Sequence, residues 1–252
     1  MSQLSKFGSL AHWLIGSLMR IIIFSDLHAN LEALSALHAC EKPPDALFFL
    51  GDIVGYGPDP APCLAWTRAY ATHIVRGDHD HATATGADFA SREEYRDLAI
   101  ATREHTLRQL RPADLAYLAS LPTTARVELG GARFFLAHGA PREPLTRALD
   151  FSMMPENKLR EELESVDADV ILLGHTHVPA IRRVGNAHIV NPGSLGQPRH
   201  GLPSATYAVW EDGHLQIKHI DYDPAPTQNK IALMAIEPEM AERLREILGR
   251  GM

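Results

Sequence analysis

The sequence predicts an α/β fold whose strands are buried on both faces and carry polar residues at their carboxyl ends. Residues 47–50 form an apolar run that leads into Gly51 and Asp52. A continuous apolar run of this length is typical of a strand covered on both sides. Glycine lets the backbone turn sharply, so the carboxylate of Asp52 is delivered just past the end of the strand. Ligands of open α/β sheets bind at that edge.

Four further segments repeat this design. Each is an apolar stretch that is followed at once by aspartate or histidine. Five such segments in one chain are hard to explain unless their polar residues share one site. The four segments are residues 21–25, followed by Asp26 and His28; 73–77, followed by Asp78, His79 and Asp80; 134–137, followed by His138; and 170–174, followed by His175 and His177.

Composition excludes several classes of function. The 252 residues carry a formal net charge of −7, from 24 Lys and Arg against 31 Asp and Glu. This balance leaves no basic stripe to neutralise many phosphates, so a long nucleic acid is not an expected partner. A small phosphorylated substrate remains open, because metal ions can supply positive charge locally. The two cysteines, Cys40 and Cys63, make no disulfide framework or thiolate zinc site, which predicts a cytoplasmic protein.

Residues 1–18 are expected to be an N-terminal extension of a single domain that spans residues 19–252. The apolar stretch at residues 10–18 is too short to cross a bilayer. A single lysine, Lys6, precedes it and no clear small-residue cleavage site follows it. We therefore expect neither a signal peptide nor an association with membranes.

Helices are predicted between the strands. Asn30 is a suitable N-cap for a helix from residue 31 to about residue 40, and a second helix is predicted over residues 62–70. Residues 82–121 mix charged and apolar residues at a spacing that predicts two or three amphipathic helices. This insert comes directly after His79, so it could overhang the site as a partial lid.

The second half of the chain is predicted to be rich in strands. Residues 125–129 and 132–137 read as a hairpin that turns at Gly130 and Gly131. The other predicted elements are a helix at 159–166, strands at 180–184, 187–191, 206–210 and 215–220, and a C-terminal helical segment at 225–252 with a break near Pro238.

The polar residues at the strand ends suit divalent metals. A mixed set of aspartate and histidine without cysteine fits borderline or hard ions, of which Mn is our first expectation and Fe, Zn, Mg and Ni are alternatives. Three aspartates and four histidines are too many for one open catalytic ion, and they fit two ions that share one carboxylate. Two-metal sites clamp a phosphoryl group and activate a water.

The same residues resemble the five motifs of the calcineurin-like metallophosphoesterase superfamily. In order and approximate spacing they match its small bacterial and archaeal phosphodiesterase branch. The likeness covers the chain from residue 21 to about residue 200. The matching residues are Asp26-Leu27-His28, Gly51-Asp52, Gly77-Asp78-His79-Asp80, Ala137-His138-Gly139 and Gly174-His175-Thr176-His177, with Gly55-Tyr56-Gly57-Pro58-Asp59 and Asn191-Pro192-Gly193-Ser194 in support.

The resemblance implies a four-layer αββα sandwich of two mixed sheets, with the site at the sheet edges. It implies that His79 sits beside the leaving oxygen, as a general acid or as a charge stabiliser. A hydroxide that bridges the metals would attack phosphorus in line. By the same resemblance, the first metal is held by Asp26, His28, Asp52 and His177, with Asp52 bridging, and the second is completed by Asp78, His138 and His175.

Two departures from the family pattern bear on mechanism. The family usually has asparagine where this chain has Asp78. In its protein phosphatases, an aspartate three residues after the bridging aspartate orients the general-acid histidine, and here that position is Gly55. Either Asp59 or Asp80 could take over this role, or His79 could act without a carboxylate. The departure counts against a protein phosphatase.

The resemblance favours an enzyme that hydrolyses small phosphodiesters such as cyclic nucleotides or nucleotide-like diesters. The alternatives are hydrolysis of phosphomonoesters or dinucleoside polyphosphates, and a non-catalytic scaffold like the retromer subunit that shares this fold. Arg142 and Arg199 follow motif segments and could touch the substrate phosphate, although surface ion pairing explains them equally well. A homo-oligomer is compatible with the sequence.

Overall fold

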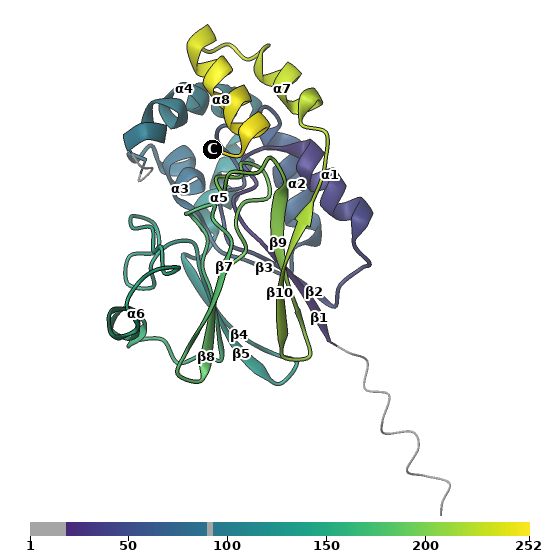
Figure 1. Cartoon of the computed structure of the whole chain (residues 1–252). Helices are drawn as coiled ribbons and strands as arrows, with labels where there is room; N and C mark the ends of the chain where they lie inside the picture. Colours follow the sequence, from purple (N-terminus) through teal and green to yellow (C-terminus); the bar gives the residue numbers. More distant parts are fainter. Residues whose placement is uncertain (1–18, 90–92) are drawn as a thin grey trace, which may run out of the picture.

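The computed structural model describes residues 19–89 and 93–252, and in these ranges the chain forms ten strands and eight helices. The strands make two mixed five-stranded sheets that face each other, with helices outside them (Figure 1). The first sheet has the order β10-β9-β1-β2-β3. Its strands are β1 (Arg20–Phe24), β2 (Ala46–Phe49), β3 (His73–Ile74), β9 (Ala205–Glu211) and β10 (His214–Ile220).

The second sheet has the order β4-β5-β6-β8-β7. In each sheet three neighbouring strands are parallel: β1, β2 and β3 in the first, and β5, β6 and β8 in the second. The parallel strands therefore send their carboxyl ends to one edge of each sheet. The strands of the second sheet are β4 (Thr124–Leu129), β5 (Ala132–Ala137), β6 (Val170–Leu172), β7 (Ala180–Val184) and β8 (Ala187–Asn191).

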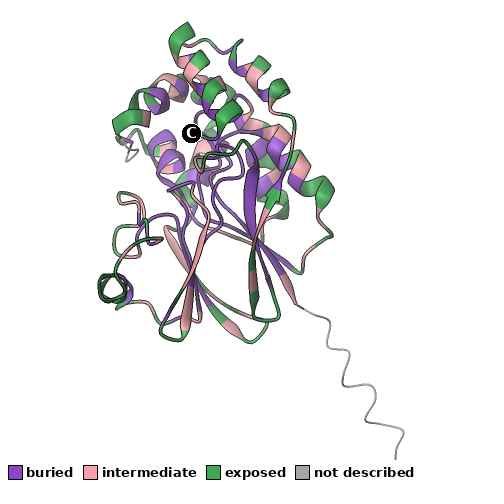
Figure 2. Ribbon diagram, viewed as in Figure 1, coloured by how far each residue is buried: buried purple, intermediate pink, exposed green. Residues whose placement is uncertain are grey.

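Alternation along the strands builds a four-layer structure. Ile21 and Ile23 of β1 pack between the sheets against residues such as Phe134 of β5. Ile22 and Phe24, which point the other way, pack against helices outside the first sheet. The outer face of the second sheet is covered by a separate apolar cluster that includes α6 (Glu156–Leu163). Inner strands such as β2 and β6 are buried throughout, whereas the edge strands β4 and β10 are mostly half-buried or exposed (Figure 2). Two facing sheets with apolar clusters on their outer sides confirm the predicted αββα sandwich.

The helices outside the first sheet begin close to the predicted positions. The helix α1 (Leu31–Cys40) is capped by Asn30, whose Oδ1 accepts a hydrogen bond from Ala33 N at 3.1 Å, as predicted. The helix α2 (Pro60–Tyr70) starts two residues earlier than predicted, because Pro60 occupies the first turn, where its missing N–H is not needed.

The helix α6 both starts and ends three residues before the range 159–166 that the sequence indicated. Its first residue, Glu156, is polar and exposed, so the apolar pattern could not mark the true start. At the other end, Val166 N donates to Leu163 O in a turn, so this apolar residue follows the helix.

The predicted insert and the C-terminal segment gather at one end of the sandwich (Figure 1). The insert contains three helices, but the first begins at Asp78, four residues before the predicted start. Side chains from both segments share one buried apolar cluster, in which Leu98 and Leu244 take part. The helices are α3 (Asp78–Thr85), α4 (Glu93–Gln109) and α5 (Pro112–Ser120) in the insert, and α7 (Ala225–Ile231) and α8 (Pro238–Arg250) at the C-terminus.

Two expectations concern parts of the chain rather than its core. The predicted N-terminal extension, residues 1–18, lies outside the described residues. Within residues 19–89 and 93–252, no helix combines the length and the apolar character that are needed to cross a bilayer.

A core substitution tests the packing of the first sheet against its helices. Phe49 is fully buried, and its ring stacks on Phe24 with centroids 4.5 Å apart. We expect Phe49→Ala to lower the free energy of unfolding by about 3–5 kcal/mol, through lost burial and the cavity left behind. Urea denaturation measures the change. Met153→Ala is the control, because Met153 is 92% exposed and its loss should change stability by less than about 0.5 kcal/mol.

Candidate metal centre

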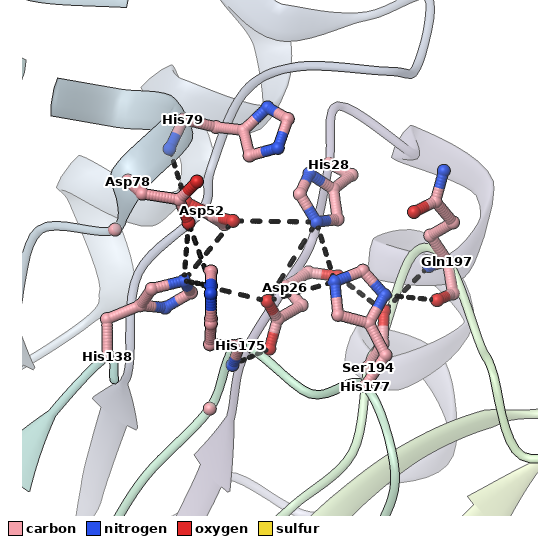
Figure 3. A network of polar contacts seen from close by, with 12 residues as sticks. Asp26, His28, Asp52, Asp78, His79, His138, His175, His177, Ser194 and Gln197 are labelled. Carbon is pink, nitrogen blue, oxygen red and sulfur yellow. Dashed lines mark hydrogen bonds and ion pairs between the residues drawn. The ribbon is translucent and has the colours of Figure 1, made fainter. Parts of the chain in front are cut away.

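All five sequence segments deliver their polar residues to one place, where the two sheets meet at the carboxyl ends of their parallel strands. Figure 3 shows His28 and His177 on one side, His138 and His175 on the other, and Asp26 and Asp52 between them. The first sheet supplies Asp26, His28, Asp52 and Asp78, and the second supplies His138, His175 and His177. The seven predicted ligands form two groups whose candidate ligand atoms lie within 4.8 Å of one another in each group.

The backbone turns sharply at most of these residues. Glycine at position 51 has a φ of 97°, and Asp52 follows with a φ of 62°. Non-glycine residues rarely adopt positive φ, and such strain persists where the surroundings over-determine it. Here hydrogen bonds from Asp26 N to Gly51 O and from His28 N to Asp52 O, both 3.0 Å, tie the two turns together. The other ligands with positive φ are Asp26, His28, His175 and His177.

The first group consists of Asp26, His28 and His177. Its atoms converge: His177 Nε2 lies 3.2 Å from Asp26 Oδ1 and 3.1 Å from His28 Nε2. The opposite ring nitrogens donate to backbone carbonyls, His28 Nδ1 to Val54 at 3.2 Å and His177 Nδ1 to Gln197 at 2.6 Å. A histidine held in this way presents the lone pair of Nε2 to a metal.

The second group consists of Asp52, Asp78, His138 and His175. His138 Nδ1 donates to Leu50 O at 2.8 Å, so its Nε2 faces the carboxylates. That Nε2 lies 3.1 Å from Asp78 Oδ1 and 3.3 Å from Asp52 Oδ2. His175 Nδ1 approaches the same Asp78 oxygen at 2.9 Å.

Asp52 lies between the two groups. Its Oδ2 is 3.3 Å from His138 Nε2 in the second group and 3.6 Å from His28 Nε2 in the first. Its other oxygen accepts a hydrogen bond from His79 N at 2.9 Å, which fixes the orientation of the carboxylate. This is the position that a carboxylate shared by two ions must occupy.

The electrostatics of this centre call for a cation. Asp26, Asp52 and Asp78 are at most 3% exposed. Burial, and then repulsion from Asp78, raise the pKa of Asp52 well above its ordinary value. Burial alone would also raise the pKa of Asp26, but His177, His138 and His28 together bring it below the usual range. Buried carboxylates are tolerated only with a compensating charge nearby.

Two buried carboxylate oxygens to which no described residue donates a hydrogen bond also indicate a cation at this centre. Within residues 19–89 and 93–252, no group donates a hydrogen bond to Asp26 Oδ1 or to Asp78 Oδ2, although both atoms are buried. Buried acceptors without partners are rare in native proteins, and a metal ion is one accepted reason for them. The residues present therefore fit divalent metals, with one acceptor oxygen available in each group.

His79 lies over the centre among aromatic rings, and one of its ring nitrogens lies within 4.8 Å of candidate ligand atoms of His28 and Asp52. Its ring centroid is 4.4 Å from that of Tyr56, 4.9 Å from His28 and 5.0 Å from Phe89. A Cβ atom at position 55 would overlap His79 Nδ1, so the glycine there leaves room for the imidazole. Burial lowers the pKa of His79 to about 3, with Asp78 opposing the shift.

The suggestion that Asp59 or Asp80 orients His79 is wrong. Asp59 Oδ2 pairs with Lys230 Nζ at 2.8 Å. The buried carboxylate of Asp80 accepts hydrogen bonds from four backbone N–H groups instead. The amides that reach Asp80 are those of Asp52 at 2.9 Å, Ile53 at 2.9 Å, Val54 at 3.3 Å and Gly77 at 3.2 Å.

Asp80 therefore holds the turn that carries Asp52. Sequence reasoning missed this role, and the one local signal for it is a position three residues after Gly77, where a carboxylate can bind the N-terminal amides of a helix. Burial raises the pKa of Asp80, although its backbone partners favour the anion. We call Asp80 and its four amide partners the amide clamp.

The two arginines differ in position. Arg142 is about half exposed and forms an ion pair with Glu164 at 3.2 Å, which places it on the surface near α6. Arg199 lies close to the centre, and its Cζ is 5.6 Å from the ring centroid of Tyr56. The structure thus places Arg199 near the centre and Arg142 in a surface ion pair.

The amide clamp yields a prediction about both stability and metal affinity. In Asp80→Asn the amide NH₂ faces backbone donors, so at least one buried N–H group loses its acceptor. We expect a loss of about 1–3 kcal/mol in the free energy of unfolding, together with weaker metal binding because Asp52 is no longer held. Urea denaturation and calorimetric titration with Mn²⁺ measure the two effects.

The matched control is Asp114→Asn. Asp114 occupies the equivalent position of α5 and accepts a hydrogen bond from Arg111 N at 3.0 Å, but it belongs to neither ligand group. Its variant should bind Mn²⁺ as tightly as the unaltered protein. Equal metal affinity in both variants would contradict a link between Asp80 and the centre.

Comparison with known proteins places this centre in a family. The family model of the calcineurin-like phosphoesterase superfamily domain matches residues 19–212. The chain is 28% identical over 249 residues to an uncharacterised protein of Methanocaldococcus jannaschii, covering 91% of this chain and 98% of that one. It is 26% identical over 228 residues to the phosphodiesterase YfcE of Escherichia coli, covering 88% of this chain and all of that one.

Solved structures agree with the sequence relatives. A metallophosphoesterase from Sphaerobacter thermophilus is 29% identical, covers 93% of this chain and 100% of its own, and has a TM-score of 0.76. A hypothetical protein from Pyrococcus horikoshii, 21% identical with 92% and 98% coverage and a TM-score of 0.79, shares the fold. The chain therefore belongs to the calcineurin-like phosphoesterase superfamily and is a metal-dependent hydrolase of phosphoric esters.

Proposed function

We propose that the protein hydrolyses small phosphodiesters with two divalent metal ions. The observation that carries this proposal is the position of Asp52 between two ligand groups, each with a buried oxygen that lacks a hydrogen-bond donor in the described part of the chain. The phosphodiester class is supported by the likeness to YfcE, which is named a phosphodiesterase and is matched over its whole length.

The two ligand groups would hold one ion each. The first would use Asp26, His28 and His177, and the second Asp78, His138 and His175, with Asp52 shared. Bound there, the ions would neutralise phosphoryl oxygens and lower the pKa of a bound water. We propose Mn as the native metal because mixed imidazole and carboxylate ligands suit it. Asp78 in place of a neutral amide adds an anion to the second site, which should tighten that site.

His79 would act as a neutral hydrogen-bond donor toward the leaving oxygen. A general acid must be protonated near the working pH, whereas burial brings the pKa of His79 to about 3. A neutral imidazole still has one N–H group with which to stabilise developing charge. Between the two roles that the sequence leaves open, we therefore propose charge stabilisation. Arg199 would add a fixed positive charge for the phosphoryl group.

The side of the centre between His28 and the helices α7 and α8 is closed, because the cavity there is about 10 Å³, which is room for roughly one water. We propose small phosphoesters as partners, without long nucleic acid or membrane, because a net charge of −7 leaves no basic stripe to neutralise a polymer. We also propose a cytoplasmic location, since Cys40 and Cys63 are both free.

The direct test is an assay of metal-stripped protein with phosphodiesters and phosphomonoesters. We expect chelator to abolish activity and Mn²⁺ to restore it at least as well as Mg²⁺, with diesters hydrolysed faster than monoesters. Full activity without metal would contradict the two-metal proposal. Faster hydrolysis of monoesters, or of dinucleoside polyphosphates, would instead support the alternatives that the sequence left open.

Metal stoichiometry is checked in the same preparation. Calorimetric titration should show two Mn²⁺ per chain, and His138→Ala should weaken one site much more than the other. A titration that ends at one equivalent for the unaltered protein would show that the groups share a single ion.

The role of His79 is tested by its leaving-group dependence. His79→Ala should lower kcat by about 10²–10³-fold, the usual effect of losing one preorganised donor, while metal binding stays nearly unchanged. Because a neutral donor does not transfer its proton, the loss should be similar for nitrophenyl and alkyl leaving groups. A much smaller loss for nitrophenyl esters would assign His79 as a general acid.

A further inference from the structure

The guanidinium of Arg199 contacts two tyrosine rings that come from different parts of the chain. Its Cζ lies 3.6 Å from the ring centroid of Tyr95, in the first turn of α4, and 5.6 Å from that of Tyr56, in the loop after β2. Its Nη2 donates to Gln197 Oε1 at 2.5 Å. A cation at these distances over an aromatic face is attracted to it, and the contact with Tyr95 is the closer one.

This arrangement lies next to the metal centre. The ring of Tyr56 is 4.4 Å from that of His79 and 4.7 Å from that of His28, so Arg199 is separated from the centre by one ring. The loop of Arg199 also supports the centre directly, because Gln197 O accepts the hydrogen bond from His177 Nδ1. A phosphoryl group bound at the centre would lie within the field of this guanidinium.

Arg199 has donors left for a ligand, and Nε is one of them. Its Nε is buried, and among the residues that the structure describes no acceptor reaches it. A buried N–H group without a partner is destabilising by itself. A phosphate oxygen is a strong acceptor, and arginine binds phosphate with several donors of its planar group at once.

Contacts with the C-terminal helices hold the part of α4 that carries Tyr95. Arg243 of α8 donates from Nη2 to the carbonyl oxygen of Glu94 at 2.7 Å, which fixes the first turn of α4. One turn further, Leu98 is fully buried against Leu244 and other residues of the C-terminal helices. The C-terminal segment thus packs against the part of α4 that carries Tyr95, and the ring of Tyr95 contacts the guanidinium.

We infer that Tyr95 is a positioning residue for phosphate binding: it holds the guanidinium of Arg199 beside the metal centre so that Nε and the charge meet a phosphoryl group. An unsupported arginine side chain would lose rotamer freedom on binding a ligand, and a preorganised one has lost it already. The inference rests on the proposed function in that the ligand is a phosphoryl group.

The test uses inorganic phosphate as the probe, titrated calorimetrically into the full-length protein loaded with Mn²⁺. Tyr95→Leu should raise the dissociation constant of phosphate about three- to thirtyfold, the range for loss of a cation–π contact. Tyr95→Phe keeps the aromatic face and should stay within about twofold of the unaltered protein. In an Arg199→Ala background, Tyr95→Leu should have no further effect, because the residue acts through Arg199.

The matched control is Tyr117→Leu, which removes a second cation–π contact in which Arg68 lies 4.8 Å from the ring centroid. Phosphate affinity should not change there. With a phosphodiester substrate, Tyr95→Leu should raise KM while kcat changes by less than about threefold, because the reacting groups are untouched.

Three results would overturn the inference: unchanged phosphate affinity in Tyr95→Leu, failure of Tyr95→Phe to restore it, or equal effects of Tyr95→Leu with and without Arg199. Failure of the proposed function is seen separately, as absence of phosphodiester hydrolysis by the unaltered protein. Coupling between Tyr95 and Arg199 in phosphate binding would stand even then.

Discussion

Three buried carboxylates in one place are the constraint on which the rest of this structure depends. Asp26, Asp52 and Asp78 are almost inaccessible to solvent, and burial of unpaired charge is among the most unfavourable changes that folding can make. His138 partly offsets it, since burial alone would lower the pKa of its imidazole but Asp52, Asp78 and Asp26 raise it. Divalent ions would complete the balance, which links metal binding to stability as well as to catalysis.

The carboxylates are held by strained backbone conformations, which other contacts of the fold must stabilise. Asp52 has a left-handed backbone at φ 62°, in a turn that the chain would not choose alone. The amide clamp supports it, because Asp80 satisfies Asp52 N and three neighbouring N–H groups with one carboxylate. The carboxylate of Asp80, which belongs to neither ligand group, thus keeps the carboxylate of Asp52 in place between them.

The surroundings of the centre come from segments that the ligand motifs do not include. The family model ends at residue 212, whereas α7 and α8 lie beyond it and close the side of the centre near His28. These helices also hold the first turn of α4, on which Tyr95 lies. The family's common part therefore supplies the ligands, and the remaining helices restrict the space and orient Arg199. This division explains why a family match identifies the chemistry better than it identifies the substrate.

The sequence by itself determined the fold class and the seven candidate ligands, because each depends on a local signal. A buried strand needs an apolar run, and the sharp turn after it is marked by a glycine such as Gly51. The cap at Asn30 and the hairpin at Gly130 follow from equally local rules. Their positions are decided by neighbours within about four residues, so the order of residues is enough.

Only the tertiary structure decided the partners of Asp80, the space at Gly55 and the stacking of Arg199 on Tyr95. Each of these depends on distances between segments that lie 24 to 104 residues apart, from the contact of residue 55 with His79 to the contact of Arg199 with residue 95. No periodicity encodes such a distance. It is set by how the sheets pack and where the helices end, and this is why the sequence indicated the seven candidate ligands and missed the residues that hold them in place.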